Sequence, residues 1–221
     1  MRAVLCRSLS FLVLVLLAAA AGPAAAAPLR LTVGPSGLSV SGISPKGRAV
    51  LFGITREVAA DDVAAILPHL DVLSDDDGDG MVAADLGHPM PRRSLWVAVD
   101  LASGDFAAAA PERFRLRKVG WKGRGLDRRP DGRDQVEDAR PFAEVLVVRP
   151  GAGAWTLRLG DGGPGDADGA ADGRIAAALD RLEPLAGSPA PPSRFAPGDV
   201  VVLLDPNAME MVLVKVGEER K

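Results

Sequence analysis

The fold class is decided by the stretch Leu95-Trp96-Val97-Ala98-Val99-Asp100-Leu101. Tryptophan and β-branched residues favour extended backbone, and side chains alternate between the two faces of a strand. The run therefore predicts a strand. The next segment, Ser103-Gly104-Asp105, predicts a tight hairpin turn that is followed by a second strand over Phe106–Ala110. One face of this strand is expected to carry Leu95, Val97, Val99 and Leu101, and the other Trp96, Ala98 and Asp100.

Further short runs of β type precede this strand, separated by Gly, Pro and Asp. Pro68 would confine one of them to a sheet edge, and Val63–Leu67 has a helical turn as its alternative. Together the runs give about seven strands in about 85 residues, with the turn spacing of a β-sandwich. The expected strands are Leu29–Val33, Leu38–Ser41, Ala49–Thr55, Ile66–Leu73 and Met81–Leu86.

The C-terminal part of the chain returns to the same pattern. Arg174–Leu185 fits either a helix or a strand, because its apolar residues match both periods. A Gly/Asp loop is expected over Gly160–Gly173 and a Pro-rich connection over Pro184–Pro197. The expected strands are Ala143–Arg149, Trp155–Leu159, Asp199–Leu204 and Met209–Val216.

Two pairs of segments suggest an internal repeat. Asp79–Leu86 resembles Asp172–Leu179, and Leu95–Asp100 resembles Val200–Asp205. Chance similarity between low-complexity segments is the alternative. A genuine repeat makes residues 175–179 a strand and the chain a pair of related β modules.

The N-terminus has the features of a signal peptide. Arg2 and Arg7 precede a short apolar run from Leu9 to Leu17, and small residues follow to Ala27. The apolar run is shorter than the ~20 residues of a membrane span, which argues against the alternative of an anchor. Removal of residues 1–27 takes away Cys6, the only cysteine, and leaves 24 basic against 29 acidic residues, a net charge of −5. We therefore expect an exported bacterial protein, periplasmic or extracellular, without disulfides and without a nucleic-acid partner.

The charge balance reverses over residues 112–140, which hold ten basic and six acidic residues. Gly and Pro interrupt Gly120–Gly132, which predicts a loop, and Arg113–Val119 is expected to be an edge strand. The chain is thus divided into a signal peptide (1–27), a β-sandwich module (28–111), an Arg-rich connector (112–140) and a second β module (141–221).

The sharpest chemical motif is the acidic segment Asp75–Gly80. Asp75, Asp77 and Asp79 stand at positions 1, 3 and 5 of a D-x-D-x-D-G pattern, which resembles the first half of EF-hand and dockerin calcium loops. That resemblance implies Ca²⁺, a hard cation that takes six to eight oxygen ligands. Position 12 holds Leu86 instead of a bidentate Glu, so Asp85 would have to substitute. The alternative is a solvated turn between two strands.

Other candidate sites are weaker. A second acidic loop places Asp166, Asp168 and Asp172 at positions 1, 3 and 7, a poorer calcium pattern. His69 and His88 lack metal-ligand neighbours and are expected to be ordinary surface residues. No G-x-S-x-G elbow or P-loop is present in the sequence, so no catalytic residue is predicted. Trp96, Trp121 and Trp155 form either a carbohydrate platform or core packing, and for Trp96 and Trp155 the strand pattern favours the core.

Residues Leu38–Thr55 and the strand order resemble exported bacterial Ig-like modules of the IPT/TIG or CNA-B kind. The resemblance implies an all-β, Ig-like antiparallel sandwich, built as two small modules in tandem, that binds or spaces rather than catalyses. The expected function is a non-enzymatic structural or binding role in the cell envelope or outside the cell, with Ca²⁺ as a stabilising ion. A cell-surface polymer or another envelope protein is the expected partner. The alternatives are a module for carbohydrate or anionic polymers, using Trp121 and the Arg-rich stretch, and a hydrolase with an unrecognised site.

Overall fold

The all-β class is confirmed by a computed structural model of the chain. The structure describes residues 27–58, 64–86, 93–109, 116–118, 126–128, 132, 134–139, 143–158, 175–205 and 210–217. These residues form strands β1 to β16 and a single 3-10 turn, η1 (Leu179–Arg181). Within these ranges no helix has the length and apolar character needed to cross a membrane.

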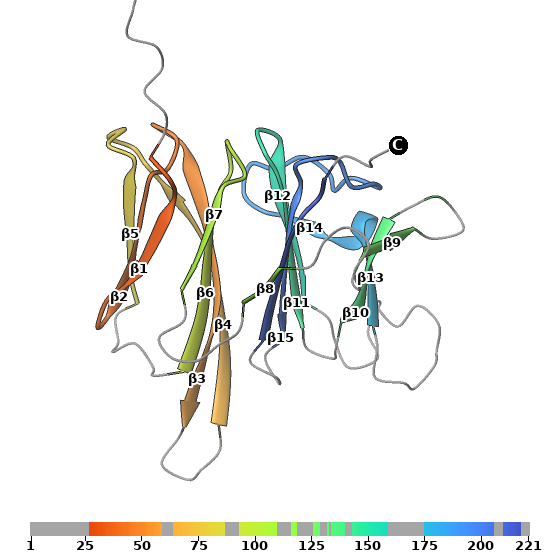
Figure 1. The fold of residues 1–221 in the computed structure, drawn as a ribbon, viewed down its shortest axis with the longest axis horizontal. Helices are drawn as coiled ribbons and strands as arrows, with labels where there is room; N and C mark the ends of the chain where they lie inside the picture. Colours follow the sequence, from red (N-terminus) through yellow and green to blue (C-terminus); the bar gives the residue numbers. More distant parts are fainter. Residues whose placement is uncertain are drawn as a thin grey trace, which may run out of the picture.

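The first half of the chain forms two antiparallel sheets, with strand orders β1-β2-β5 and β4-β3-β6-β7. The three-stranded sheet lies beside the four-stranded sheet (Figure 1), and residues of both sheets form one apolar cluster. Its strands are β1 (Arg30–Val33), β2 (Gly37–Ser41) and β5 (Met81–Asp85). The four-stranded sheet contains β3 (Arg48–Val58), β4 (Ala64–Ser74), β6 (Arg93–Asp100) and β7 (Phe106–Ala109).

The second half forms two further sheets, with orders β14-β12-β11-β15-β16-β8 and β13-β10-β9. Every pairing in them is antiparallel except that of β16 with β8. The larger sheet contains β8 (Leu116–Lys118), β11 (Glu144–Arg149), β12 (Gly153–Arg158), β14 (Glu183–Pro184), β15 (Val200–Asp205) and β16 (Glu210–Lys215). The smaller contains β9 (Leu126–Arg128), β10 (Asp134–Ala139) and β13 (Ile175–Ala178).

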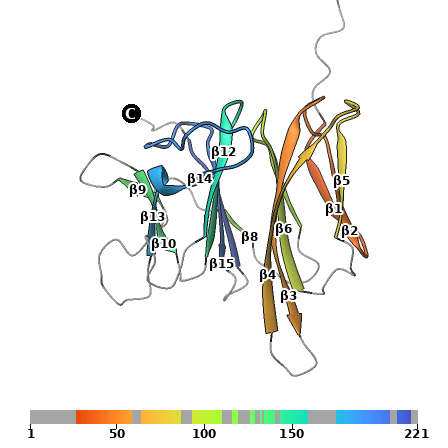
Figure 2. The ribbon, with the colours of Figure 1, turned by 180° about the vertical axis from the view of Figure 1, so that it is seen from behind.

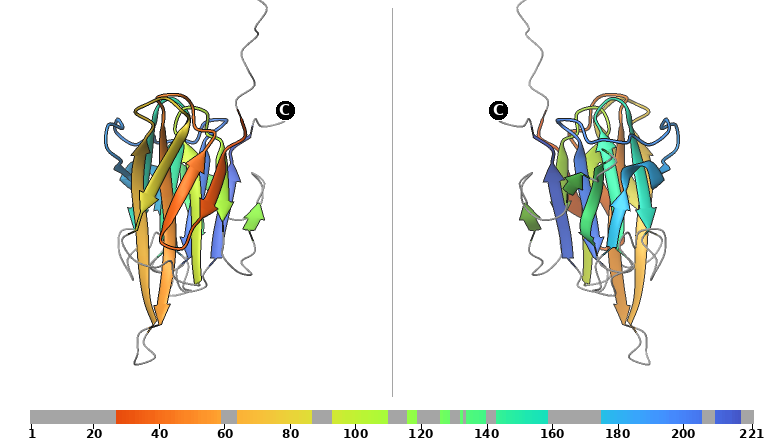
Figure 3. Two further views of the ribbon diagram at one scale, coloured as in Figure 1. Left: turned by 90° about the vertical axis from the view of Figure 1, so that its left-hand side faces the viewer. Right: turned by 90° about the vertical axis from the view of Figure 1, so that its right-hand side faces the viewer.

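The four sheets stack as layers, which Figures 1 and 2 show from the front and from behind. The strands of all four layers run close to one common direction (Figure 3), as in aligned sheet packing. The two inner sheets are buried on both faces. Their facing surfaces share one apolar cluster, which includes Val50, Phe52, Ile54, Val97, Val99, Leu146, Val148, Val200, Val202 and Leu213. Two outer clusters, one around Trp96 and one around Trp155, join each inner sheet to its three-stranded neighbour.

The two halves repeat one strand order. Strands β1 to β7 correspond in sequence order to β9, β10, β11, β12, β13, β15 and β16, and each pair of hydrogen-bonded neighbours in the first set recurs in the second. The segments that resemble each other in sequence take equivalent places, β5 with β13 and β6 with β15. Residues Ile175–Ala178 are therefore a strand, as the repeat predicts, and the helical alternative is wrong. The second half adds β8 and β14 at the two edges of its larger sheet.

Most of the expected strands are confirmed within a residue or two. Strand β4 is an edge strand, as Pro68 predicts, and it replaces the helical alternative for its first residues. The hairpin at Ser103–Asp105 is confirmed, and Gly104 there has a φ of +70°. The side chains of β6 alternate between the inner and outer clusters as expected.

In the Arg-rich connector, the edge strand expected over Arg113–Val119 is confirmed as β8, but the other expectations fail. Strand β9 lies inside the loop predicted over Gly120–Gly132, and strand β10 was not predicted. Residues 112–140 supply strands to both sheets of the second half, so this part of the chain is more than a linker. Strand β9 is a short strand at a sheet edge, where few apolar side chains are needed. Strand β10 is the central strand of its sheet, and backbone pairing on both sides makes it a strand although most of its residues are polar.

Candidate functional site

The acidic loop Asp75–Gly80 joins β4 to β5 and is organised around one buried carboxylate. Asp75 is 2% exposed. Its Oδ1 accepts a hydrogen bond from Gly78 N at 3.1 Å, and its Oδ2 accepts bonds from Lys46 N at 3.0 Å and Gly80 N at 3.1 Å. Asp75 thus closes the loop upon itself and onto the turn before β3.

The other two carboxylates of the motif face the same point. Asp77 Oδ1 accepts a bond from Asp79 N, and Asp79 Oδ1 accepts one from Met81 N at 2.8 Å. One carboxylate oxygen each of Asp75, Asp77 and Asp79 lies within 4.8 Å of the other two, so the three could hold a metal ion. Gly78 and Gly80 have φ values of +80° and +77°, a region that favours glycine and that the tight loop requires.

Hydrogen bonding sets the ionisation of Asp75. Burial of the carboxylate raises its pKa, but hydrogen bonds from the backbone of Gly80, Lys46 and Gly78 and a side-chain bond with Asp77 outweigh that effect. The pKa of Asp75 is therefore lowered below 3.8, and its carboxylate is charged at neutral pH.

The remaining predicted ligands do not join this cluster. Asp85 lies at the far end of β5, paired with Gly37, whereas Met81 begins β5 beside the loop. Four strand residues span roughly 13 Å, so Asp85 does not substitute for the missing ligand at position 12. Asp166, Asp168 and Asp172 lie outside the described residues.

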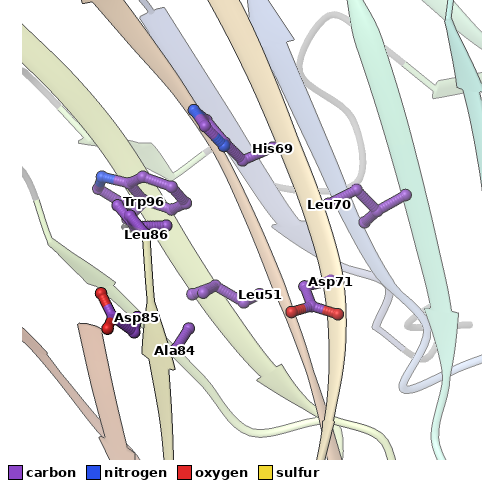
Figure 4. A pocket seen from close by; sticks show the side chains of 8 residues that line it. All are labelled: Leu51, His69, Leu70, Asp71, Ala84, Asp85, Leu86 and Trp96. Atoms are coloured by element: carbon purple, nitrogen blue, oxygen red, sulfur yellow. The ribbon is translucent and has the colours of Figure 1, made fainter. Parts of the chain in front are cut away.

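A groove opens between the edge strands β4 and β5, at the Asp85 end of β5. It has a volume of about 310 Å³ and is lined by Leu51, His69, Leu70, Asp71, Ala84, Asp85, Leu86 and Trp96. Figure 4 shows the aromatic rings of His69 and Trp96 toward one end and the carboxylates of Asp71 and Asp85 toward the other. The groove therefore joins an aromatic end to an acidic end.

Trp96 forms the aromatic end because of a glycine beside it. Gly53 pairs with Trp96 on one side and with His69 on the other, and a Cβ at Gly53 would collide with the indole ring. The ring centroids of His69 and Trp96 are 5.1 Å apart with a tilt of 39°, and His69 Nε2 lies 3.1 Å from Thr55 Oγ1. Among the described residues, the buried Nε1 of Trp96 has no hydrogen-bond partner.

The equivalent position in the second half is covered. Val147 pairs with Trp155 and Val201, as Gly53 pairs with His69 and Trp96. Trp155 in turn pairs with Pro184 of β14, and its Nε1 donates to Pro189 O at 2.7 Å. Figure 1 shows β14 beside β12, where β4 has no described strand on its outer side.

These findings revise several site predictions. His69 is a half-buried ring-packing residue rather than an ordinary surface histidine, and Gly53 opposite an aromatic strand position was the available signal. Trp96 and Trp155 are 0% and 1% exposed, which confirms core packing and removes them from a carbohydrate platform. His88 and Trp121 lie outside the described residues.

Comparisons with protein-family models, with curated proteins and with solved structures each give no match.

Proposed function

We propose that this protein is a non-enzymatic binding or structural component of the cell envelope, exported by its N-terminal segment and built of two tandem Ig-like sandwiches. The observation that carries the proposal is the repeated strand order, three strands in one sheet and four in the other, with the third, sixth and seventh strands together. This order resembles the Ig-like arrangement with the fourth strand moved to the sheet of the third, and the resemblance supports the proposal. Ig-like sandwiches in exported proteins characteristically bind and space.

A rigid body suits that role. The inner sheets share an apolar cluster that includes Phe52 and Leu146. At one end of the second half, Arg149 holds the buried Asp199 through two hydrogen bonds of 2.9 and 2.8 Å, an arrangement that fixes the chain before β15. Two sandwiches that share one apolar cluster would present their outer edges at a fixed spacing.

Localisation and partner capture test the proposal. The protein recovered from its host is expected in the periplasm or medium, with a new N-terminus near Ala27 or Pro28, and the mature chain is expected to retain a component of its own cell envelope. Intact Met1 chain in a membrane or cytoplasmic fraction, or turnover of a substrate by the purified protein, would contradict it.

Calcium stabilisation is a second element of the proposal. The observation that favours it is the approach of three carboxylates at the Asp75–Gly80 loop. Because Asp75 already accepts three hydrogen bonds, Asp77 and Asp79 would supply most of the free lone pairs, and the affinity would lie in the weak range of extracellular sites.

A further inference from the structure

Strand β1 begins almost directly after the expected end of the signal peptide. The bond to be cleaved lies just before or just after Ala27. Leu29 is 8% exposed and belongs to the apolar cluster around Trp96, and Arg30 pairs with Ser41 of β2. The core of the first sandwich (β1 to β7) therefore begins within two residues of Ala27, without a spacer between them.

Ala27 and Pro28 themselves lie against the fold through their main chain. Their side chains are exposed, but their carbonyl oxygens face the bare backbone of Gly42 and would lie only 2.8 and 2.7 Å from a Cβ at that position. Gly42 is fixed in turn, because its N–H donates to Gly80 O at 3.0 Å in the loop between β4 and β5. The cleavage region thus ends in a main-chain contact with the folded sandwich.

A peptidase needs this same main chain. An extended peptide is bound mainly through hydrogen bonds to its main-chain groups, which requires a free segment on both sides of the bond to be cleaved. On the C-terminal side that segment includes Leu29, which is in the core, and Arg30, which is in the β1–β2 ladder. In the folded chain, cleavage therefore requires β1 to detach first, and its rate depends on the small fraction of chains that are open.

We propose that the first sandwich withholds its own cleavage site, so that the signal peptide is removed before this sandwich folds and the chain reaches the peptidase unfolded. The proposal rests on the export proposed above and adds an order of events to it. A chain that folds first stays in its precursor form.

The test compares the cleavage of full-length chains by a purified bacterial signal peptidase in detergent micelles. The wild-type chain is folded before the enzyme is added. In Val40→Asp a charge enters the buried face of β2, where Val40 is 0% exposed, so the first sandwich is prevented from folding while residues 1–39 are unchanged. We expect Val40→Asp to be cleaved about tenfold faster than the folded wild type, or more.

Two controls separate folding from the substitution itself. Ser39→Asp places the same carboxylate on the opposite face of β2, where Ser39 is half-buried, and should be cleaved as slowly as wild type. A flexible spacer of about six Gly and Ser residues between Pro28 and Leu29 moves the bond away from the folded sandwich and leaves the residues up to Pro28 unchanged. The folded spacer variant should be cleaved as rapidly as Val40→Asp.

The outcomes distinguish this proposal from the export on which it rests. Equal cleavage of folded wild type and Val40→Asp would overturn the order of events and leave export standing. A spacer variant that is cleaved as slowly as wild type would do the same. Cleavage of none of the four chains would overturn both, because the N-terminal segment would then not act as a signal peptide.

Discussion

At the scale of single residues, the Asp75–Gly80 loop combines two kinds of carboxylate. Asp75 is buried, and its two carboxylate oxygens accept three hydrogen bonds from backbone N–H groups. Asp77 and Asp79 are exposed, and each accepts one hydrogen bond from a backbone N–H group. The loop is complete as a hydrogen-bonded turn, so an ion would add to its stability rather than create it.

Calcium at this loop can be tested without breaking the turn. With a Kd on the order of 10⁻⁴–10⁻³ M, ten-millimolar calcium is expected to raise the melting temperature by roughly 3–10 °C relative to chelator. Asp77→Asn and Asp79→Asn keep the acceptor oxygen and remove the charge, so they should abolish the calcium response. Asp76→Asn changes a neighbour outside the cluster and serves as the control. A calcium response that persists in Asp77→Asn would place the ion elsewhere.

Asp75 should make stability depend on pH in the acid range. Its pKa is lowered in the folded state, so its contribution is present above about 3.8 and is lost as the pH falls through the lower folded value. In Asp75→Asn one carboxylate oxygen becomes an amide N–H₂ group, which cannot accept a hydrogen bond. This group would face either Gly78 N or the pair Lys46 N and Gly80 N, which are donors themselves. The variant should therefore have a melting temperature several degrees lower at pH 7. Thermal melts between pH 2 and 7 should show the gap between wild type and variant narrowing below pH 3.8. A gap that widens there would contradict the assignment.

At the scale of elements, strands rich in apolar and β-branched residues could be predicted from the sequence, and strands with few such residues could not. Strand β6 and its two faces were predictable from Leu95–Leu101, because burial on both faces leaves a continuous apolar run. Strands β9 and β10 were missed because Arg and Asp surround their few apolar residues, and pairing rather than composition makes them strands.

The candidate site divides in the same way. The acidic loop can be recognised in the sequence because its three carboxylates lie within five residues of one another. The groove cannot, because tertiary packing brings its residues together from β3, β4, β5 and β6. In the first half Trp96 of β6 lies beside Gly53 of β3, whereas in the second half Trp155 of β12 lies beside Val147 of β11. This difference between the halves becomes visible from the register of the sheets and could not be predicted from the sequence.

Gly53 provides a test of how β3 shapes the groove. Gly53→Ala places a Cβ against the Trp96 indole and the Leu95 carbonyl, so the ring must shift. We expect a loss of about 1–3 kcal/mol, as for overpacking in other cores, and changed chemical shifts at His69 and Trp96. Ala98→Gly, on the same sheet face, changes volume without that collision and should leave the His69 ring signals in place. An unchanged indole environment in Gly53→Ala would show that the ring is held by other contacts.

At the scale of the whole molecule, the shared layer between the inner sheets predicts that the two halves unfold together. Phe52 from the first half and Leu146 from the second are both fully buried in it. Phe52→Ala and Leu146→Ala should each cost about 3–5 kcal/mol and lower one and the same calorimetric transition. Two transitions, of which each variant shifts only one, would contradict this coupling.

The shared layer also bears on how the chain is made. Synthesis completes the first half before the second has emerged. Until then, the face of β3 and β6 that packs against the second half in the complete protein has no partner sheet to cover it. This face carries Val50, Phe52, Ile54, Leu95, Val97 and Val99. An apolar area of that kind on a nascent chain is a surface that holding chaperones bind and that promotes aggregation. Production of the first half alone would thus require the same protection, and co-expression with the second half is the natural way to supply it.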